Sequence, residues 1–478
     1  MKQLAALLVL LALPCPPRAA AAVPGAGVVA LLTHADAGRG LARPELFRRM
    51  AHRARARRRL LSAPANAQER ALVVRAPVRA GLGGGGGGIV TNEYLLRVSV
   101  GTPPRPVALT LDTGSDLVWT QCAPCRGCFD QRLPLLDPAA SSTYAALPCG
   151  SPPCRALPFA SCGGGGGGRG RGNRTCAYAY HYGDKSVTVG HLATDRFTFG
   201  DADDAGGGNA GAGGSLAARR LTFGCGHFNK GVFQSNETGI AGFGRGPWSL
   251  PSQLNVTSFS YCFTSMFEHK SSVVTLGGAP AAALRGAARV AGEVRSTPLL
   301  RNPSQPSLYF LSLHAISVGS TRIPVPAAAA SRRASATAII DSGASVTTLP
   351  EDLYEAVRAA FAAQIGLPPA GIGAEGAALD LCFALPVVAA AFWRRRAAVA
   401  VPALTLHLEG ADWEMPRGNY VFEDIAARVM CVVLDAAPGG EQTVIGNFQQ
   451  QNTHVVYDLK NDRLSFAPAR CDRLVASL

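Results

Sequence analysis

Two short segments of the sequence place an aspartate in the same local setting. Leu109–Ser115 contains Asp112 and Ala338–Ala344 contains Asp341; in each, an apolar, β-prone run precedes the aspartate, and a hydroxyl residue and a glycine follow it. Neither segment contains a basic residue that could pair with its carboxylate. Two aspartates that face each other can share one proton, because two close carboxylates cannot both ionise cheaply. Such a pair can activate a water molecule for attack on a peptide carbonyl.

The prediction depends on the repeat more than on either copy. A single Asp-Thr/Ser-Gly tripeptide is common, and its simplest interpretation is a turn after a strand. Two copies in the same context are much rarer by chance. The candidate supporting residues are the neighbours of the two aspartates: Thr113, Gly114, Ser115, Ser342 and Gly343.

Each half of the chain also contains a short apolar stretch that ends in glycine. Gly239–Gly242 follows the first aspartate, and Thr443–Gly446 follows the second. Glycine would allow such a strand to pass close beneath the loop that bears the aspartate. The repeat is therefore of domain size, and the length of 478 residues also favours two lobes.

The elements between these motifs are predicted to be strands. From Glu93 onward, short alternating runs are separated by Gly, Pro, Asn and Asp, as at Tyr94–Val100 and Tyr309–Leu313. The clearest helix is predicted over Pro350–Phe361, with acidic residues in its first turn. The predicted fold class is therefore all-β with a few short helices.

The N-terminal part of the sequence is typical of a secreted precursor. Residues 1–22 combine a basic residue, an apolar run and small residues, which predicts a signal peptide; a signal anchor is the alternative. We assign residues 23–88 to a basic pro-segment with a Gly-rich junction. Residues 89–285 are assigned to an N-terminal lobe with a Cys-rich insert at 122–176, and residues 286–478 to a C-terminal lobe.

The formal net charge of +14 is concentrated in the predicted pro-segment. Residues 23–88 hold twelve arginines and three acidic residues, and Arg53–Arg59 alone holds five of those arginines. A nucleic-acid-binding role is disfavoured, because this basic run has no interleaved aromatic residues and follows a secretion signal. A cation of the pro-segment could instead lie over the acidic pair and keep it inactive until cleavage.

The cysteine count fits an oxidising compartment. Cys15 is one of thirteen cysteines and leaves with the signal, so the remaining twelve can all pair. Seven lie within 122–176 and five lie beyond it, so at least one disulfide must join the two groups; the pairing is otherwise open. A metal site at the Cys-x2-Cys-x2-Cys run of the insert is disfavoured, because no His cluster accompanies it. The predicted disulfide cysteines are Cys122, Cys125, Cys128, Cys149, Cys154, Cys162, Cys176, Cys225, Cys262, Cys382, Cys431 and Cys471.

Three N-glycosylation acceptors point to the same compartment. They are Asn173, Asn236 and Asn255, and each is followed two residues later by a threonine.

Further motifs resemble the pepsin-like aspartic protease family, and specifically its nepenthesin-like plant branch. The resemblance covers essentially all of Glu93–Cys471. The matching motifs are Leu111–Trp119, Cys122–Cys176, Tyr182–Ser186, Phe223–Gly226, Gly242–Pro247, Leu250–Leu254, Phe259–Cys262, Ile340–Gly343, Val444–Phe448 and Val456–Asp458. The resemblance implies a bilobal β fold with a central cleft. It also implies that Asp112 and Asp341 are the catalytic pair, and that Thr113 and Ser342 supply hydroxyls that cross-link their loops.

The family's flap, a hairpin that closes over substrate, also has counterparts here. Tyr182 matches the flap tyrosine and Trp119 its packing partner; ordinary aromatic core residues are the alternative for both. Lys185 stands where glycine is common. Ala344 stands where a Ser or Thr usually donates a hydrogen bond to the second aspartate, a donor that Ser115 keeps in the first half. Because losing a donor destabilises a charged carboxylate, we expect a pH optimum less acidic than is usual for the family.

The sequence thus predicts a secreted aspartic endopeptidase that acts on protein or peptide substrates. We expect no metal, no other cofactor, no nucleic-acid partner and no membrane anchor in the mature form, which we expect to be a monomer. The resemblance implies apolar substrate side chains next to the cut bond. From the secretion signal we expect a location outside the cell, in the cell wall space, with the vacuole as an alternative. The alternative function is a catalytically weak or inactive binding or inhibitor protein on the same fold, for which Ala344 and Lys185 leave room.

Overall fold

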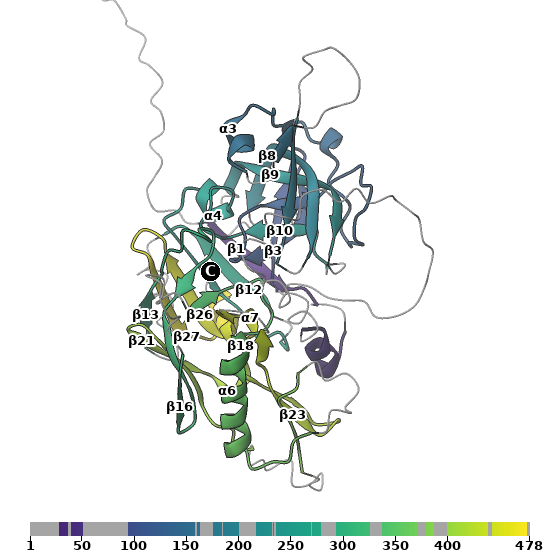
Figure 1. Ribbon diagram of the computed structural model, residues 1–478. Coiled ribbons are helices and arrows are strands. Elements are labelled where there is room, and N and C mark those ends of the chain that lie inside the picture. The colour runs from purple at the N-terminus through teal and green to yellow at the C-terminus, as the bar shows by residue number, and fades with distance from the viewer. Residues whose placement is uncertain are drawn as a thin grey trace, which may run out of the picture.

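The computed structural model is a two-lobed β protein (Figure 1). It describes residues 28–36, 40–50, 94–157, 160–162, 175–183, 185–199, 217–231, 233, 236–268, 270–278, 293–325, 337–370, 379–386, 399–437 and 442–475. The predicted signal peptide, the arginine run at 53–59 and the acceptor Asn173 lie outside these residues. The predicted all-β class is confirmed, because strands dominate both lobes and the helices are few and mostly short.

A single sheet of 15 strands runs through the N-terminal lobe and joins it to the C-terminal lobe. The five strands at one end of this sheet come from distant parts of the chain: β13 (Arg295–Pro298), β27 (Arg463–Pro468), β26 (Thr453–Asp458), β11 (Ser258–Cys262) and β12 (Ser272–Leu276). β11 pairs antiparallel with β12 and with β26, and β26 pairs antiparallel with β27. Both halves of the sequence therefore contribute to the sheet that lies between the lobes (Figure 1).

Each of the two candidate aspartates lies at the end of a buried strand. β3 (Arg105–Asp112) ends on Asp112 and pairs in parallel with β10 (Gly239–Gly242). β17 (Ala338–Ile340) ends just before the second aspartate and pairs in parallel with β25 (Thr443–Ile445). The predicted passage of a glycine-ended strand beside each aspartate loop is confirmed.

Two glycines make this close passage possible. A Cβ atom on Gly242 would lie 2.2 Å from the backbone of Asp116, and one on Gly446 would lie 2.5 Å from the backbone of Val346. Real Cβ atoms do not approach backbone so closely, so only glycine fits at either position.

The N-terminal lobe is built on two long strands. β8 (Val187–Phe199) and β9 (Ala217–Lys230) pair antiparallel over most of their length. β7 (Cys176–His181) pairs with the other edge of β8, and the turn between β7 and β8 carries Tyr182. The other elements of this lobe are β2 (Tyr94–Val100), β4 (Trp119–Gln121), the 3-10 turn η1 (Pro138–Ala140), β5 (Ala145–Ala146), α3 (Pro152–Ala156), β6 (Ala160–Cys162) and α4 (Leu250–Gln253).

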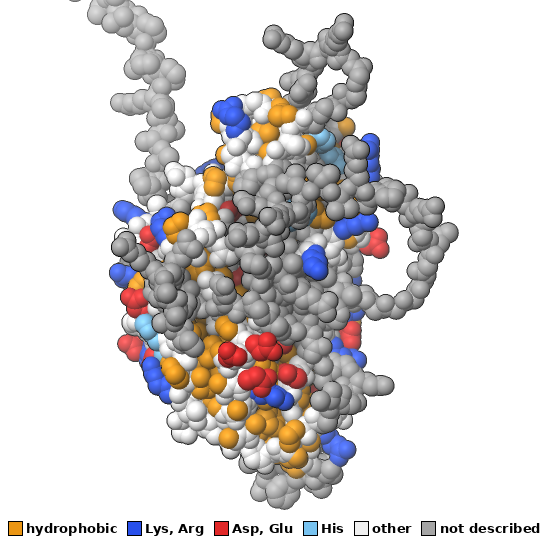
Figure 2. Space-filling model, in the orientation of Figure 1, with side chains coloured by type: hydrophobic (Ala, Val, Ile, Leu, Met, Phe, Trp, Pro, Cys, Tyr) orange, Lys and Arg blue, Asp and Glu red, His pale blue; other side chains and the backbone are white. Residues whose placement is uncertain are grey.

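The C-terminal lobe carries the longest helix among the described residues, α6 (Glu351–Gln364). The helix predicted over Pro350–Phe361 is confirmed, although its ends are shifted toward the C-terminus. Figure 2 shows acidic side chains gathered on this lobe near α6, whose first turn holds Glu351 and Asp352. Its other elements are β14 (Phe310–Leu311), β15 (Leu313–Val318), β16 (Thr321–Pro324), β18 (Thr348–Pro350), β19 (Cys382–Ala384), β20 (Leu404–Leu408), β21 (Ala411–Met415), η4 (Arg417–Asn419), β22 (Val421–Asp424), β23 (Val429–Val432), β24 (Asp435–Ala437), α7 (Asn447–Gln450) and α8 (Cys471–Val475).

Part of the predicted pro-segment is built into the body of the protein. β1 (Val28–His34) lies between β2 and β12 and pairs antiparallel with both. Residues 43–50 are helical. From this helix, the ring of Phe47 stacks on that of Phe422 with centroids 3.8 Å apart, and Met50 is fully buried in the same apolar cluster. We call residues 28–50 the N-terminal segment.

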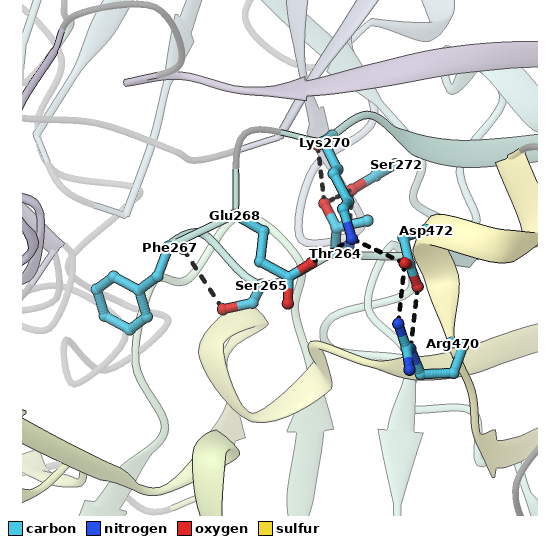
Figure 3. A network of polar contacts seen from close by, with 8 residues as sticks. All are labelled: Thr264, Ser265, Phe267, Glu268, Lys270, Ser272, Arg470 and Asp472. Carbon is cyan, nitrogen blue, oxygen red and sulfur yellow. Dashed lines mark hydrogen bonds and ion pairs between the residues drawn. The ribbon is translucent and has the colours of Figure 1, made fainter. Parts of the chain in front are cut away.

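A charged network holds the hairpin loop against which this segment packs (Figure 3). Asp472 pairs with Lys270 at 2.8 Å and with Arg470 at 3.1 Å. Hydrogen bonds from Arg470 and Lys270 hold the pKa of Asp472 well below its usual range. Phe267 lies in the same loop and points away from these charges, and the Arg43 guanidinium lies over its ring at 4.6 Å. The loop thus offers an aromatic surface to the N-terminal segment.

Six disulfides use all twelve of the predicted cysteines. Cys122–Cys225 is the bridge that joins the Cys-rich insert to the rest of the chain. The other five are Cys125–Cys128, Cys149–Cys162, Cys154–Cys176, Cys262–Cys471 and Cys382–Cys431. Within the described ranges, no group of three or more His, Cys, Asp or Glu side chains is arranged to hold a metal ion. No helix among the described residues is both long and apolar enough to cross a membrane.

Candidate active site

The two aspartate loops are tied together by reciprocal hydrogen bonds. The Thr113 N–H donates to Ser342 Oγ at 3.0 Å, and the Ser342 N–H donates to Thr113 Oγ1 at 2.9 Å. Ser342 Oγ also donates to the Leu111 carbonyl at 3.0 Å, whereas Thr113 Oγ1 lies 3.4 Å from the Ile340 carbonyl. Thr113 and Ser342 are almost fully buried, so water does not compete for these bonds. The structure thus places the two hydroxyls between the loops.

The two carboxylates have unequal local donors. Asp112 accepts a hydrogen bond from Ser115 Oγ at 2.5 Å and one from the Gly114 N–H at 3.0 Å. Asp341 accepts the corresponding backbone bond from the Gly343 N–H at 2.8 Å. The residue that matches Ser115 is Ala344, which has no hydroxyl to donate. The internal repeat is therefore symmetric in its backbone but not in its side-chain donors.

Gly114 brings the first loop directly against the second carboxylate. A Cβ atom on Gly114 would lie 2.7 Å from the carboxylate carbon and from both carboxylate oxygens of Asp341. Asp112 is fully buried and Asp341 is 1% exposed. The geometry therefore gathers two buried carboxyl groups on facing loops, which is the arrangement that a proton-sharing pair needs.

The turn between β7 and β8 of the N-terminal lobe carries Tyr182, which is close enough to Asp112 to interact with its charge. The Trp119 Nε1–H donates to the Tyr182 hydroxyl at 2.7 Å. Burial raises the pKa of Tyr182 well above its ordinary value, so the hydroxyl keeps its proton. Tyr182 can therefore accept from Trp119 and still donate to a second group.

An aromatic cluster surrounds Trp119. The ring of Phe233 meets Trp119 edge-on at 5.6 Å and stacks on Phe129 at 4.3 Å. The rings of Tyr180 and Tyr182 lie 5.1 Å apart. These rings form a largely buried apolar cluster in the N-terminal lobe beside the turn that carries Tyr182.

Lys185 adopts a backbone conformation that explains why glycine is common at its position. Its φ is 66°, in the left-handed region, and its N–H donates to the Tyr182 carbonyl at 3.1 Å. Glycine enters this region without steric cost, whereas a side chain pays roughly 1 kcal/mol. The side chain of Lys185 is exposed.

Asp116 is a functional candidate that the sequence analysis missed. Its carboxylate accepts from the Gly246 N–H at 2.9 Å and from the Ser307 hydroxyl, which belongs to the C-terminal half of the chain. Burial raises the pKa of Asp116, and the charge of Asp112 adds to the effect. A Cβ on Gly246 would lie 2.0 Å from this carboxylate. The sequence did contain a signal for Asp116: it is a second acidic residue close behind Asp112, and no basic residue lies near it in sequence to pair with it.

The glycosylation acceptors within the described residues differ in their surroundings. Asn255 is exposed and lies at a turn with φ of 51°. Asn236 is half-buried, and its Nδ2 donates to the Ala35 carbonyl of the N-terminal segment.

Sequence comparison matches residues 94–278 to the family described as "Xylanase inhibitor N-terminal" and residues 308–468 to "Xylanase inhibitor C-terminal". The chain is 36% identical over 448 residues to aspartic proteinase nepenthesin-1 of Nepenthes gracilis, which covers 93% of this chain and 90% of that protein. It is 36% identical over 387 residues to aspartyl protease family protein 2 of Arabidopsis thaliana, which covers 80% of this chain and 71% of that protein.

Structural comparison gives the same fold. The crystal structure of basic 7S globulin from soybean superposes with a TM-score of 0.60 at 19% identity, covering 80% of this chain and 95% of that chain. Conglutin gamma, a basic 7S globulin from lupine seeds, superposes with a TM-score of 0.59 at 21% identity, covering 80% and 94%. At such low identity these two matches establish the fold alone.

Proposed function

The chain belongs to the pepsin-like aspartic protease family, in its nepenthesin-like plant branch, and we propose that it is an endopeptidase that cleaves peptide bonds with a water molecule held between Asp112 and Asp341. The observation that carries the proposal is the pair of buried carboxyl groups on loops that Thr113 and Ser342 cross-link. Such a cross-link fixes the reacting groups relative to each other before substrate arrives, which is what general acid–base catalysis requires.

The unequal donors assign the roles in the reaction. Asp112 accepts two hydrogen bonds within its own loop, so it is the member that holds the negative charge. Its carboxylate takes a proton from the water as the water oxygen attacks the peptide carbonyl carbon. Asp341, in its neutral form, gives its proton to the carbonyl oxygen, which produces a tetrahedral diol.

The second half of the reaction returns both protons. Asp112 gives the proton it received to the peptide nitrogen, and the C–N bond breaks as one diol hydroxyl returns a proton to Asp341. The products are a carboxylic acid and an amine, and both aspartates regain their starting states. The attacking water and the two aspartates account for every proton transferred, and the reaction needs no oxidant or reductant.

The aromatic cluster around Trp119 supports a preference for apolar substrate side chains next to the cut bond. Trp119 and Phe233 are buried, but Phe129 and Tyr182 at the edge of the cluster are only half-buried, and an apolar side chain that displaces water from their exposed parts gains free energy. Tyr182 lies at the edge of this cluster, where its hydroxyl can donate to substrate.

A secreted life history is part of the same proposal. Six disulfides fit an oxidising compartment, and an exposed acceptor at Asn255 fits passage through the secretory route. The protein would be made as a precursor, lose its signal peptide, be cleaved behind its pro-segment, and act as a monomer outside the cell or in the vacuole. Protein or peptide chains would be its partners, with no nucleic acid among them.

A binding or inhibitor function is the second candidate. Two observations favour it: the matched family carries the description "Xylanase inhibitor", and Ala344 removes one donor from the second loop. The two buried aspartates, Ser115 and the Trp119–Tyr182 bond favour catalysis instead, because a binding protein needs none of them.

A digestion experiment separates these two functions. The purified precursor is incubated with a denatured protein from acid to neutral pH, beside an Asp112→Asn variant, and the fragments are identified by mass spectrometry. We expect fragments from the wild-type protein that pepstatin suppresses and that the variant does not produce. Pepstatin-insensitive cleavage that survives the substitution would overturn the proposed mechanism. If the denatured substrate protein stays intact at every pH, the binding function is favoured.

A further inference from the structure

A line of buried hydroxyls connects the two aspartate loops by a second route, below the Thr113–Ser342 cross-link. The Tyr457 hydroxyl hydrogen-bonds with the Thr113 side chain and lies 3.0 Å from the Tyr261 hydroxyl. Tyr261 donates to Gln450 Oε1 at 2.5 Å. Tyr457, Tyr261 and Gln450 have no exposed surface. A buried polar group is costly unless it is hydrogen-bonded, so this line must be satisfied as a whole.

The far end of the line reaches the second aspartate loop. Gln450 Nε2 donates to the Ile445 carbonyl at 2.8 Å and to the Asp341 carbonyl at 3.4 Å. The N–H of Asp341 in turn donates to the Ile445 carbonyl at 3.1 Å. Gln450 therefore contacts the backbone on which the second aspartate is mounted.

The direction of every donor in the line follows from counting protons. Each tyrosine hydroxyl has one proton. Tyr261 uses its proton on Gln450, so Tyr457 donates to Tyr261. The single proton of Thr113 Oγ1 is shared between the Ile340 carbonyl and the Tyr457 hydroxyl. Because Thr113 Oγ1 accepts the Ser342 N–H, the line runs in one sense from Ser342 to Gln450. Burial raises the pKa of both tyrosines, so both keep the protons that the line needs.

This line explains an asymmetry in the cross-link between the loops. The Ser342 hydroxyl donates to the Leu111 carbonyl at 3.0 Å, but the Thr113 hydroxyl stays 3.4 Å from the Ile340 carbonyl. A hydrogen bond weakens as it lengthens, and the single proton of Thr113 has a second acceptor in Tyr457. Thr113 is thus held partly by the sheet between the lobes and not only by the opposite loop.

The tyrosine rings cannot easily move away. Tyr457 stacks on Phe259 at 4.3 Å, and Tyr261 stacks on Phe263 at 4.3 Å. Tyr94 stacks on the other side of the same group, with its ring 4.0 Å from Phe263. The stacks fix the hydroxyl positions, because a ring in a packed stack cannot swing without opening a void.

We propose that Tyr457 and Tyr261 are positioning residues for the catalytic pair, which they hold in register through Thr113 at one end and Gln450 at the other. The inference rests on the proposed function, because it assigns a role in that reaction. Neither tyrosine touches substrate. Both act by keeping the two carboxyl groups at the separation at which one water can bridge them.

Two substitutions and one matched control test the inference. Tyr457→Phe and Tyr261→Phe each remove one hydroxyl from the line and keep the ring. Tyr94→Phe is the control, because its hydroxyl is equally buried in the same stack but donates at 2.6 Å to the Thr264 carbonyl, away from the aspartate loops. The measurements are kcat and KM on one peptide, and hydrogen–deuterium exchange of the Ser342 amide, whose proton enters the line.

We expect Tyr457→Phe to lower kcat about three- to tenfold with KM unchanged, as the loss of one buried hydrogen bond implies. The double variant should lose no more than Tyr457→Phe alone, because either change breaks the line. Exchange of the Ser342 amide should speed up in both variants and stay unchanged in Tyr94→Phe.

The outcomes distinguish this inference from the proposed function. If the wild-type protein cleaves peptides but Tyr457→Phe leaves kcat and the Ser342 amide exchange unchanged, or if Tyr94→Phe has the same effects, the inference is overturned. If the wild-type protein cleaves nothing and the exchange of Ser342 still depends on Tyr457, the proposed function fails while the positioning of the loops stands.

Discussion

The hydroxyl of Ser115 donates a hydrogen bond of 2.5 Å to the carboxylate of Asp112. The second loop has Ala344 at the matching position, 4% exposed, so the corresponding donor to Asp341 does not exist. This one difference breaks the symmetry of a site whose backbone bonds are otherwise repeated.

Restoring the hydroxyl should change the pH dependence of cleavage. In Ala344→Thr, a new donor to Asp341 stabilises the charged form of that carboxyl. Because Asp341 must be protonated to act as the acid, the alkaline limb of the pH–rate profile should move to lower pH. Ala344→Val is the matched control, since it adds the same volume without a hydroxyl. A strongly acidic optimum in the wild-type protein, unchanged by Ala344→Thr, contradicts the role given to this position.

Gly114 provides a test of how closely the two loops must meet. Gly114→Ala places a Cβ 2.7 Å from the carboxylate of Asp341, so the loops must separate. Because a shift of about 1 Å at a catalytic group can cost roughly a hundredfold in rate, we expect kcat to fall by about that factor. Gly418→Ala is the control, because a Cβ there meets nothing within 4 Å. Full activity in Gly114→Ala would show that the loops need not touch.

A buried histidine should limit stability in acid. His454 is 6% exposed in β26, and burial lowers its pKa from 6.5 to about 4. Between these two pH values His454 is protonated in the unfolded chain but neutral in the folded protein. The free energy of unfolding should therefore fall as the pH drops from about 6.5 toward about 4. The loss amounts to about 3 kcal/mol at the end of this window.

The substitution His454→Gln should flatten that dependence, because glutamine does not titrate. Thermal unfolding measured between pH 3 and 7 is the check, with the exposed His314→Gln as control. Equal slopes of Tm against pH in the wild-type protein and in His454→Gln would exclude His454 as the cause.

The N-terminal segment should remain bound after the chain is cut behind it. β1 pairs with strands on both sides, and Phe47 is 4% exposed against Phe422. With a specific protease site placed in Gly83–Gly88, the cleaved fragment should coelute with the body of the protein in size-exclusion chromatography.

Phe47→Ala should release much of that fragment, since truncating a buried Phe costs about 3–5 kcal/mol. Arg48→Ala, at a side chain that is 53% exposed, should leave the fragment bound. A wild-type fragment that separates after cleavage would show that the segment is held only by its covalent link.

Local patterns in the sequence were enough to predict the aspartate loops and the strands beside them. The repeat around Asp112 and Asp341 could be read directly, because strand propensity, the hydroxyl residue and glycine all lie within seven residues. The helix α6 was also predictable from its acidic first turn, and only its ends were shifted. Gly242 and Gly446 were predictable for the same reason, as single residues at the ends of apolar runs.

Long-range contacts were not predictable in the same way. Nothing in the sequence near Asp116 indicates Ser307, and nothing near Thr113 indicates Tyr457; these pairs meet only because the sheet brings distant strands together. The apolar run Val28–His34 has the pattern of a strand, but the arginines that follow it favoured a purely removable segment. The structure shows that a strand and a basic run can lie in one short stretch of chain.

The central claim, that Asp112 and Asp341 act as one catalytic unit, is tested most directly by the initial rate of cleavage of a single defined peptide. Asp112→Asn, Asp341→Asn and the double variant are compared with the wild-type protein, after their thermal unfolding shows that all four are folded. Each single substitution should lower kcat at least about a thousandfold, and the double variant should lose no more than either one, because the two groups share one proton and one water. A single variant that retains a substantial fraction of the wild-type rate would contradict the account.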